Sequence, residues 1–262
     1  MMALHQFDRM VVEDEGEGPV VVCVHGRGGS SNSFSPLMLA LSRCRVLRVD
    51  LPGSGRSQRA EGPLSIERFV HALLSMCNRL GVDQADWVGH SMGTIVCQHV
   101  ATTQPALVRS LALFGPLMAP SDPARTGLRA RAAKARSEGV AGMHEITQTL
   151  LAAALSSDTR QRLPLATAFV RESLMRQEGE AYARTCEALA EAQAARVETI
   201  RMPVLLVTGD EDTVAPPASV RAMGERLQDA SVEVLRGCGH WTPIEKPAEC
   251  AALLRAFLAR RM

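Results

Sequence analysis

Short runs of consecutive apolar residues recur along the chain, and a turn rich in glycine or serine follows each of them. The six runs are Val20–Val24, Arg45–Asp50, Asp86–Gly89, Val108–Phe114, Val204–Val207 and Val232–Leu235. Continuous apolar runs that alternate with helical segments are typical of a parallel sheet covered on both faces. The pattern therefore predicts an α/β fold built around a parallel sheet.

Apolar residues spaced three and four positions apart predict helices between these strands. The predicted helices are Ser65–Leu80, Met92–Gln104, Pro217–Leu227 and Pro247–Arg260. The segment before Val20 is short, so we expect only a brief hairpin there.

The alternation of strands and helices stops between about residues 121 and 198. This stretch has no strand-like run, is rich in Ala, Leu, Arg and Glu, and has helical periodicity. It begins after a turn with three prolines and ends just before Met202-Pro203, where a strand pattern resumes. We interpret residues 121–198 as a helical insertion in a core domain formed by residues 1–120 and 199–262.

The composition is that of a soluble globular chain. Hydrophobic residues make up 46% and charged residues 22% of the 262 positions, close to the average for such proteins. Twenty-nine Lys and Arg against 28 Asp and Glu give a formal net charge of +1, which excludes a strongly basic nucleic-acid-binding protein. We therefore expect no nucleic-acid partner.

Localisation follows from three further features of the sequence. The longest apolar runs are far too short to cross a bilayer, and the first ten residues include Asp8 and Arg9 without the apolar core of a signal peptide. The seven cysteines are odd in number and never form C-x-x-C, which favours reduced thiols over a disulfide framework or zinc site. We expect a cytoplasmic protein without a membrane partner or metal.

Gly89-His90-Ser91-Met92-Gly93 is a G-x-S-x-G pentapeptide at the predicted junction of a strand and a helix. A sharp strand-to-helix turn needs small residues on both sides, and it lifts the serine hydroxyl clear of the sheet. Ser91 is therefore a candidate nucleophile. The alternative is a glycine-rich turn in which the serine only caps a helix.

A serine nucleophile needs a base and an orienting acid, and the chain offers both after the insertion. Asp212 and His240 each follow a predicted strand, and the order Ser, Asp, His is the one that a hydrolase sheet of this kind requires. His240 stands in a glycine-rich loop, whereas His25 and His90 flank glycine turns that they are expected to hold by hydrogen bonds.

Three acids occur together in the Asp212 loop. Asp210 directly follows Gly209 and is expected to fix the turn, while Glu211 is expected to face solvent. Asp212 lies further along the loop, nearer to the expected position of His240, so we assign the orienting carboxylate to it. The other possible acid position, after Val108–Phe114, holds Gly115-Pro116 and no carboxylate.

The oxyanion of an acyl-transfer reaction needs two preorganised N–H donors. The backbone amide of Met92, directly after the nucleophile, is one candidate. The amide of Arg27, in the turn His25-Gly26-Arg27-Gly28-Gly29, is the other. A phosphate-binding loop is the alternative for this turn, but neither glycine-rich nucleotide fingerprint occurs in the chain.

Together these features resemble the α/β-hydrolase superfamily over nearly the whole chain. The motifs that support the resemblance are His25-Gly26, the segment 50–57 (DLPGSGRS), the segment 89–93, the segment 209–212 and His240 with Glu245 and Pro247 behind it. The resemblance implies a mostly parallel eight-stranded sheet, helices on both faces and a helical cap, or lid, over the site. It also implies a triad of Ser91, Asp212 and His240 and no cofactor. Related dehalogenases and epoxide hydrolases use an aspartate where this chain has Ser91.

Within the superfamily the chain looks most like 3-oxoadipate enol-lactonases and small carboxylesterases. Two stretches of the insertion, Arg131–Val140 and 180–189, are similar to that branch, but Arg27 stands where enol-lactonases commonly have an apolar residue. The implied function is hydrolysis of a small carboxylic ester or lactone through an acyl-enzyme. The alternatives are a C–C bond hydrolase of ring-cleavage products and a non-catalytic ligand-binding member of the fold.

The substrate side of the site is less defined by the sequence. Met118, Met143 and Trp241 are candidate pocket residues, although methionines are often core residues. The insertion begins with five cations, at positions 125, 129, 131, 134 and 136. Such a run is commonly a solvated helix face; alternatively, one of these arginines or Arg27 binds a substrate carboxylate. The expected assembly is a monomer or homodimer.

Overall fold

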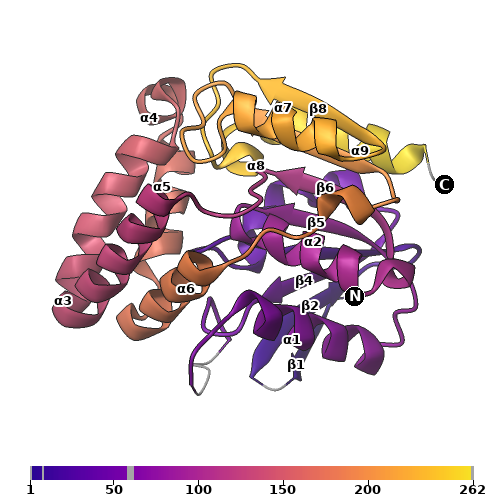
Figure 1. Cartoon of the computed structure of the whole chain (residues 1–262), viewed down its shortest axis with the longest axis horizontal. Coiled ribbons are helices and arrows are strands. Elements are labelled where there is room, and N and C mark those ends of the chain that lie inside the picture. Colours follow the sequence, from indigo (N-terminus) through magenta and orange to yellow (C-terminus); the bar gives the residue numbers. More distant parts are fainter. Residues whose placement is uncertain (1, 8, 58–61, 261–262) are drawn as a thin grey trace.

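The structure, a computed structural model, describes residues 2–7, 9–57 and 62–260, and in them eight strands form one sheet (Figure 1). The first and last residues of the interpreted core domain lie outside this range. The strands are β1 (Ala3–Phe7), β2 (Met10–Glu15), β3 (Val20–Val24), β4 (Arg45–Asp50), β5 (Ala85–His90), β6 (Val108–Phe114), β7 (Val204–Gly209) and β8 (Ala230–Leu235).

The sheet has the order β1-β2-β4-β3-β5-β6-β7-β8. The β1–β2 hairpin pairs antiparallel with itself and with β4, and every other pairing is parallel. The predicted α/β fold with a mostly parallel sheet is therefore confirmed, as is the short hairpin at the start of the chain.

Side chains along the central strands alternate between two hydrophobic clusters, one on each face of the sheet. In β3, Val22 and Val24 belong to one cluster, and Val21 and Cys23 belong to the other. The first cluster is covered by α1 (Ile66–Arg79), α2 (Met92–Thr103) and α7 (Pro217–Arg226), and the second by η1 (Ser31–Leu41) and α9 (Pro247–Ala259). Burial on both faces explains why these strands are apolar throughout.

The predicted helices agree with the structure to within a few residues, but some short elements were not anticipated. The 3-10 helix η1 contains Pro36 and several serines, which mask its apolar periodicity in the sequence. The remaining short elements are η2 (Pro105–Leu107), η3 (Val197–Thr199) and α8 (Thr242–Glu245).

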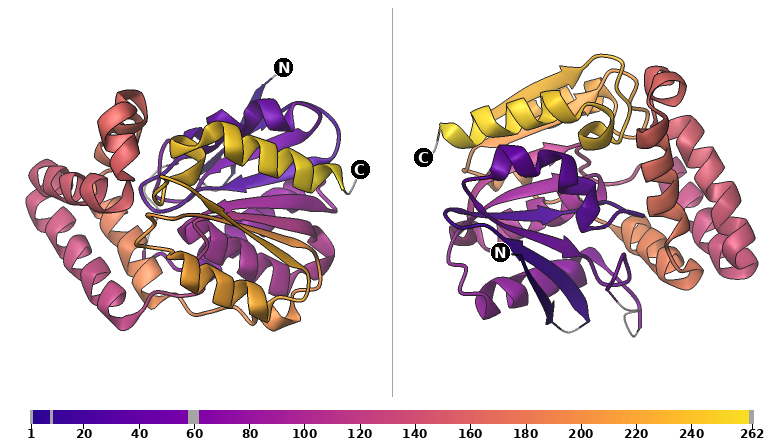
Figure 2. Two further views of the ribbon diagram at one scale, coloured as in Figure 1. Left: turned by 90° about the horizontal axis from the view of Figure 1, so that it is seen from above. Right: turned by 180° about the vertical axis from the view of Figure 1, so that it is seen from behind.

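Four helices separate β6 from β7 in the chain: α3 (Asp122–Ala154), α4 (Ser157–Arg162), α5 (Pro164–Met175) and α6 (Gly179–Glu191). They stand beside the sheet rather than over either of its faces, as both views in Figure 2 show. The long helix α3 is interrupted at Gly139, whose φ of 55° and ψ of −127° are not helical. We call α3–α6 the helical insertion. It is helical where the sequence periodicity predicts helix, and its status as a separate domain stays an interpretation.

Three observations concern the described residues only. No helix among them is long and apolar enough to span a membrane. Their seven cysteines are all free and buried. They include no cluster of three or more His, Cys, Asp or Glu side chains that could hold a metal ion.

Candidate active site

Ser91 occupies the sharp turn between the end of β5 and the start of α2. Its φ of 53° and ψ of −121° are outside the regions that residues with a Cβ normally adopt, and its amide donates a hydrogen bond of 3.0 Å to the Phe114 carbonyl. A strained serine at a strand-to-helix turn is the geometry expected of a nucleophile elbow.

Gly93 permits this turn because α2 approaches strand β3 closely there. A Cβ at Gly93 would lie 2.7 Å from the His25 carbonyl oxygen and closer still to that of Val24. The first turn of α2 can therefore pass over the end of β3 only if position 93 has no side chain. The glycine in the motif is thus a steric requirement of the fold.

His240 joins the two other predicted site residues. Its Nε2 lies 2.8 Å from the Ser91 Oγ, and its Nδ1 lies 2.8 Å from the Asp212 Oδ2. All three side chains are buried. With Nδ1 protonated toward the carboxylate, Nε2 is free to accept the serine proton. The structure thus brings together three residues that are far apart in the sequence.

The carboxylate of Asp212 is fixed by several donors. The amides of Val214 and Ala215 each donate to its Oδ1 at 2.8 Å, and the Thr208 hydroxyl lies 3.3 Å from its Oδ2. Burial acts to raise the pKa of Asp212, but His240 and the two amides outweigh it and hold that pKa below its ordinary value. Asp212 is therefore ionised and oriented.

The neighbouring acids differ from Asp212 in exposure and contacts. Asp210 is exposed, and its Oδ1 accepts a hydrogen bond of 3.2 Å from the Cys238 amide, which ties the turn together. Glu211 is also exposed, but it does more than face solvent, because its Oε2 accepts a 2.8 Å hydrogen bond from the Ser157 amide at the start of α4.

Gly115 is a site residue that sequence reasoning noted only for its missing carboxylate. Its φ is 57°, and a Cβ there would lie 2.9 Å from both Cε1 and Nδ1 of His240. Any side chain at position 115 would press on the imidazole ring. The glycine after β6 therefore makes room for His240.

The predicted oxyanion turn lies beside the serine. A Cβ at Gly26 would be 2.7 Å from the Ser91 Cβ, so the turn touches Ser91. Its shape is held by His25, whose Nε2 accepts a 2.9 Å hydrogen bond from the Leu51 amide and whose Nδ1 lies 2.7 Å from the Gly26 oxygen. Burial lowers the pKa of His25 and keeps it neutral. The amides of Arg27 and Met92 donate to no other described residue.

The DLPGSGRS segment, residues 50–57, contacts the same turn. The fully buried Asp50 accepts hydrogen bonds from the Ser31 amide at 2.6 Å and from the Arg56 Nε at 2.8 Å. Burial acts to raise the pKa of Asp50, but these donors hold it below its ordinary value. The segment is therefore a structural brace for the start of η1 and not a second reactive centre.

The helical insertion is fastened to both loops of the site. The Ser173 hydroxyl on α5 donates a 2.7 Å hydrogen bond to the Gly28 oxygen in the oxyanion turn. The His240 amide donates a 2.7 Å hydrogen bond to the Ala154 oxygen at the end of α3. Neither contact could be predicted from sequence patterns, since each joins segments more than 80 residues apart.

Glu245, noted in the sequence only as part of a motif, connects the histidine loop to the insertion. Its buried Oε2 accepts hydrogen bonds from the Ser156 amide at 2.8 Å, the Thr159 hydroxyl at 2.9 Å and the Gly239 amide at 3.1 Å. Its Oε1 accepts one from the Trp241 amide at 3.0 Å. The residues on both sides of His240 are thus held by one carboxylate.

The three predicted pocket residues have different surroundings. Trp241 and Met143 are buried in the main hydrophobic cluster, and Trp241 lies against His90 with ring centroids 5.3 Å apart. Met118 is half-buried, and its sulfur lies 3.3 Å from an Nη of Arg226 on α7. Their assignment to the substrate pocket stays a prediction.

His90, which was expected to hold the glycine turn beside it, instead contacts the histidine loop. Its Nε2 lies 2.9 Å from the His240 carbonyl oxygen. Complete burial, together with the nearby His240, lowers the pKa of His90 to about 3. His90 is therefore a neutral structural partner of the histidine loop at ordinary pH.

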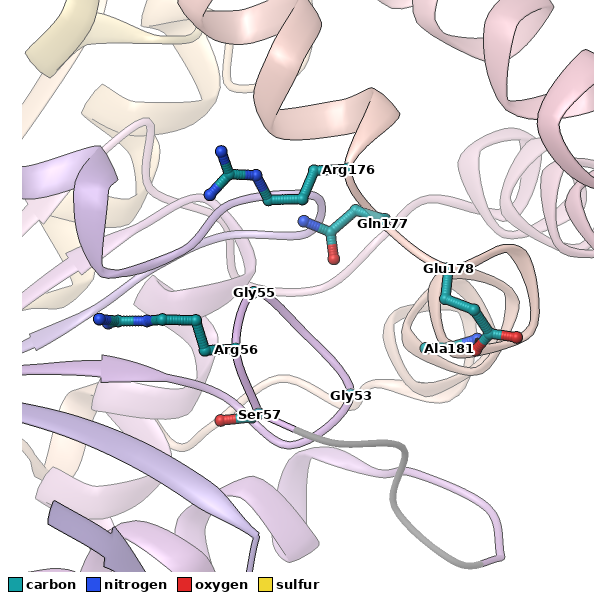
Figure 3. A pocket seen from close by; sticks show the side chains of 8 residues that line it. All are labelled: Gly53, Gly55, Arg56, Ser57, Arg176, Gln177, Glu178 and Ala181. Carbon is teal, nitrogen blue, oxygen red and sulfur yellow. Dashed lines mark hydrogen bonds between the residues drawn. The ribbon is translucent and has the colours of Figure 1, made fainter.

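A pocket of about 340 Å³ lies at the outer edge of the insertion, between the loop with Gly53 and Gly55 and the segment that joins α5 to α6 (Figure 3). Its residues do not include Ser91, Asp212 or His240. Both of its arginines already have carboxylate partners, Arg56 with Asp50 and Arg176 with Glu172. This pocket is therefore not the place where the three buried residues would act.

Comparisons with known proteins agree with this fold. A family model described as alpha/beta hydrolase fold matches residues 19–247. A 2-hydroxymuconate semialdehyde hydrolase from Pseudomonas sp. (strain CF600) is 27% identical over 96% of this chain and 90% of its own length. An esterase from Thermogutta terrifontis, solved with malate bound, has a TM-score of 0.90 at 25% identity over 96% of this chain and 93% of that one. The enol-lactonase from Burkholderia xenovorans LB400 has a TM-score of 0.89 at 26% identity over 98% and 100%.

Proposed function

The chain belongs to the α/β-hydrolase family, and we propose that it is a serine hydrolase that cleaves a small carboxylic ester or lactone through an acyl-enzyme. The observation that carries the proposal is the hydrogen-bonded series Ser91–His240–Asp212, with 2.8 Å at both steps. An enol-lactonase and an esterase among the similar structures support the choice of substrate class.

In the proposed reaction the Ser91 Oγ attacks the acyl carbonyl carbon while Nε2 of His240 takes the hydroxyl proton. Asp212 holds the imidazole in the required tautomer and stabilises the imidazolium that forms. The amides of Arg27 and Met92 donate to the oxyanion, and each such donor contributes roughly 3–4 kcal/mol of transition-state stabilisation.

His240 then gives its proton to the leaving alkoxide, which departs as an alcohol or, for a lactone, remains in the acyl group. Water attacks the acyl-enzyme with His240 as base, and the acid is released with the Ser91 hydroxyl restored. We propose that the helical insertion acts as the cap of this site, since Ser173 and Ala154 attach it to the oxyanion turn and to the histidine loop.

C–C bond hydrolysis is a second candidate, because the similar Pseudomonas protein is a 2-hydroxymuconate semialdehyde hydrolase. We also propose a reducing, cytoplasmic location, which the seven free thiols of the described residues favour. A monomer or homodimer stays a prediction.

Stopped-flow hydrolysis of p-nitrophenyl acetate tests the proposed function. We expect a burst of p-nitrophenol equal to the concentration of enzyme, followed by slower turnover, because the acyl-enzyme accumulates. The absence of both burst and turnover would favour the non-catalytic alternative. Turnover of a vinylogous ring-cleavage product in preference to every ester and lactone would favour C–C hydrolysis.

A further inference from the structure

The cations at the start of the helical insertion fall into two groups. Four of the five have partners: Arg125 with the Ala190 and Ala192 oxygens, Arg129 with Glu191, Lys134 with Glu138 and Glu145, and Arg136 with Glu180 and Glu187. Arg131 is half-buried, and among the described residues it has no hydrogen bond or ion pair. Most of the basic run is therefore a salt-bridged helix face, and Arg131 is the exception.

Arg27 has a similar environment where the oxyanion turn meets helix α6 of the insertion. Its guanidinium lies over the Tyr182 ring, 5.1 Å from the centroid, and donates a hydrogen bond to the Tyr182 hydroxyl. Its Nε is buried and has no hydrogen-bond partner among the described residues. The positive charge of Arg27 thus has a neutral aromatic partner and no carboxylate.

The two arginines are both beside helix α6, because Arg27 contacts Tyr182 of α6 and α3, which carries Arg131, packs along α6. Burial lowers the pKa of Arg131, and the charge of Arg27 lowers it further. Both guanidiniums also act on the buried Cys186, which is one helical turn after Tyr182 and on the same face of α6. Glu187, the acid that also acts on Cys186, is held by Arg136. Two partly buried like charges without a carboxylate are unfavourable unless an anion joins them.

We propose that Arg27 and Arg131 bind the free carboxylate of a substrate whose ester or lactone group is attacked by Ser91. The inference rests on the proposed function and gives it a substrate class. Guanidinium groups match the planar geometry of a carboxylate, and the Tyr182 hydroxyl can donate a further hydrogen bond to it. Because the Arg27 amide is at the oxyanion turn and its side chain is at the anion site, the carboxylate is separated from the reacting carbonyl by a short spacer.

The test compares mono-p-nitrophenyl adipate, which has a free carboxylate, with its ω-methyl ester, after correction for uncatalysed hydrolysis. We expect the wild-type protein to prefer the acid in kcat/KM by about ten- to a hundredfold, the range of one charge-assisted hydrogen bond. In Arg131→Met and in Arg27→Met this ratio should fall at least about fivefold. The ratio cancels any general loss of activity in a variant.

Arg129→Met is the matched control, since Arg129 is on the same helix and paired with Glu191 on the surface. It should keep the wild-type ratio. Adipate should also inhibit hydrolysis of p-nitrophenyl acetate competitively, with a Ki raised about tenfold in Arg131→Met but not in Arg129→Met. This measurement stands if Arg27→Met does not fold.

A wild-type ratio near one, or a ratio unchanged in Arg131→Met, overturns the anion site while the enzyme still hydrolyses the neutral ester. Loss of the preference in Arg129→Met as well also overturns it, because the preference would then come from general charge. Failure of the wild type to hydrolyse either ester defeats the proposed function itself, so the two failures are distinguishable.

Discussion

The site has a sheet side, with Ser91, Asp212 and His240, and an insertion side, with Arg27 and Arg131. The polar groups of the two sides find their partners in different ways. On the sheet side, His240 has a partner at each ring nitrogen and Asp212 has donors at both oxygens. On the insertion side, Arg131 has no partner among the described residues and Arg27 has only a tyrosine. The side chains of Ser91, His240 and Asp212 are thus hydrogen-bonded to one another without a ligand. The insertion side leaves positive charge for the substrate to neutralise, so we expect specificity to reside there.

The largest expected effect tests whether the chemistry depends on the sheet side alone. Ser91→Ala should lower kcat for p-nitrophenyl acetate at least about a thousandfold, because nucleophile and base act as one unit. Thermal unfolding should show that the fold is kept. Ser137→Ala, an exposed position on the insertion, is the control and should leave kcat unchanged. Activity of Ser91→Ala within tenfold of wild type would remove the serine from the mechanism.

The next effect separates two acids in one loop. Asp212→Asn should lower kcat by about a hundred- to ten-thousandfold, since an amide cannot both select the histidine tautomer and stabilise the imidazolium. Asp210→Asn changes an exposed residue that only accepts from the Cys238 amide, so its effect on kcat should be below about threefold. Steady-state kinetics at matched stability measure both. A larger loss for Asp210→Asn would reverse the assignment.

A smaller effect concerns the junction of the two sides. Glu245→Gln should lower the free energy of unfolding by about 2–3 kcal/mol, because an amide cannot accept the four hydrogen bonds that the buried carboxylate accepts. Urea unfolding measures the change, and the exposed Glu249→Gln at the start of α9 should stay within about 0.5 kcal/mol of wild type. Equal free energies of unfolding for the two variants would mean that the hydrogen bonds of Glu245 at this junction add no stability.

The smallest effect, for each unit of pH, is the pH dependence that His90 gives to the sheet side. As pH falls below 6.5, the unfolded chain binds a proton at His90, but the folded chain binds it only near a pKa of about 3. The stability gained from neutral His90 is therefore present above pH 6.5 and is lost by about 1.4 kcal/mol per unit as pH falls through this window. His90→Asn should flatten the acid limb of Tm against pH, whereas the exposed His144→Asn should not. If the Tm of His90→Asn still falls steeply at acid pH, other titrating groups cause the pH dependence.

Sequence patterns predicted the sheet side well because its signals are local. A few neighbouring residues are enough to recognise each strand and the G-x-S-x-G turn. The strand order then places Ser91, Asp212 and His240 at one edge of the sheet. The insertion side depends on contacts between distant segments. Among the described residues Arg131 has no partner while Arg136 has two, and this follows from how α3 packs on α6, which helical periodicity alone does not specify.

The same limit applies to Gly115 and Glu245. Gly115 was visible in the sequence as a position without a carboxylate, but its closeness to the His240 ring depends on the crossing of two loops 125 residues apart. Glu245 resembles a surface residue before a helix in the sequence, yet it is buried by the end of α3.

Labelling with a fluorophosphonate probe tests the central claim, that Ser91 is the nucleophile of an acyl-transfer enzyme, most directly. We expect one adduct per chain by intact mass, located by peptide mapping at Ser91 and absent from Ser91→Ala. Labelling should also be lost in His240→Ala, in which the base 2.8 Å from the Ser91 Oγ is missing. An adduct at another serine, or no adduct in a folded protein that hydrolyses esters, would contradict the account.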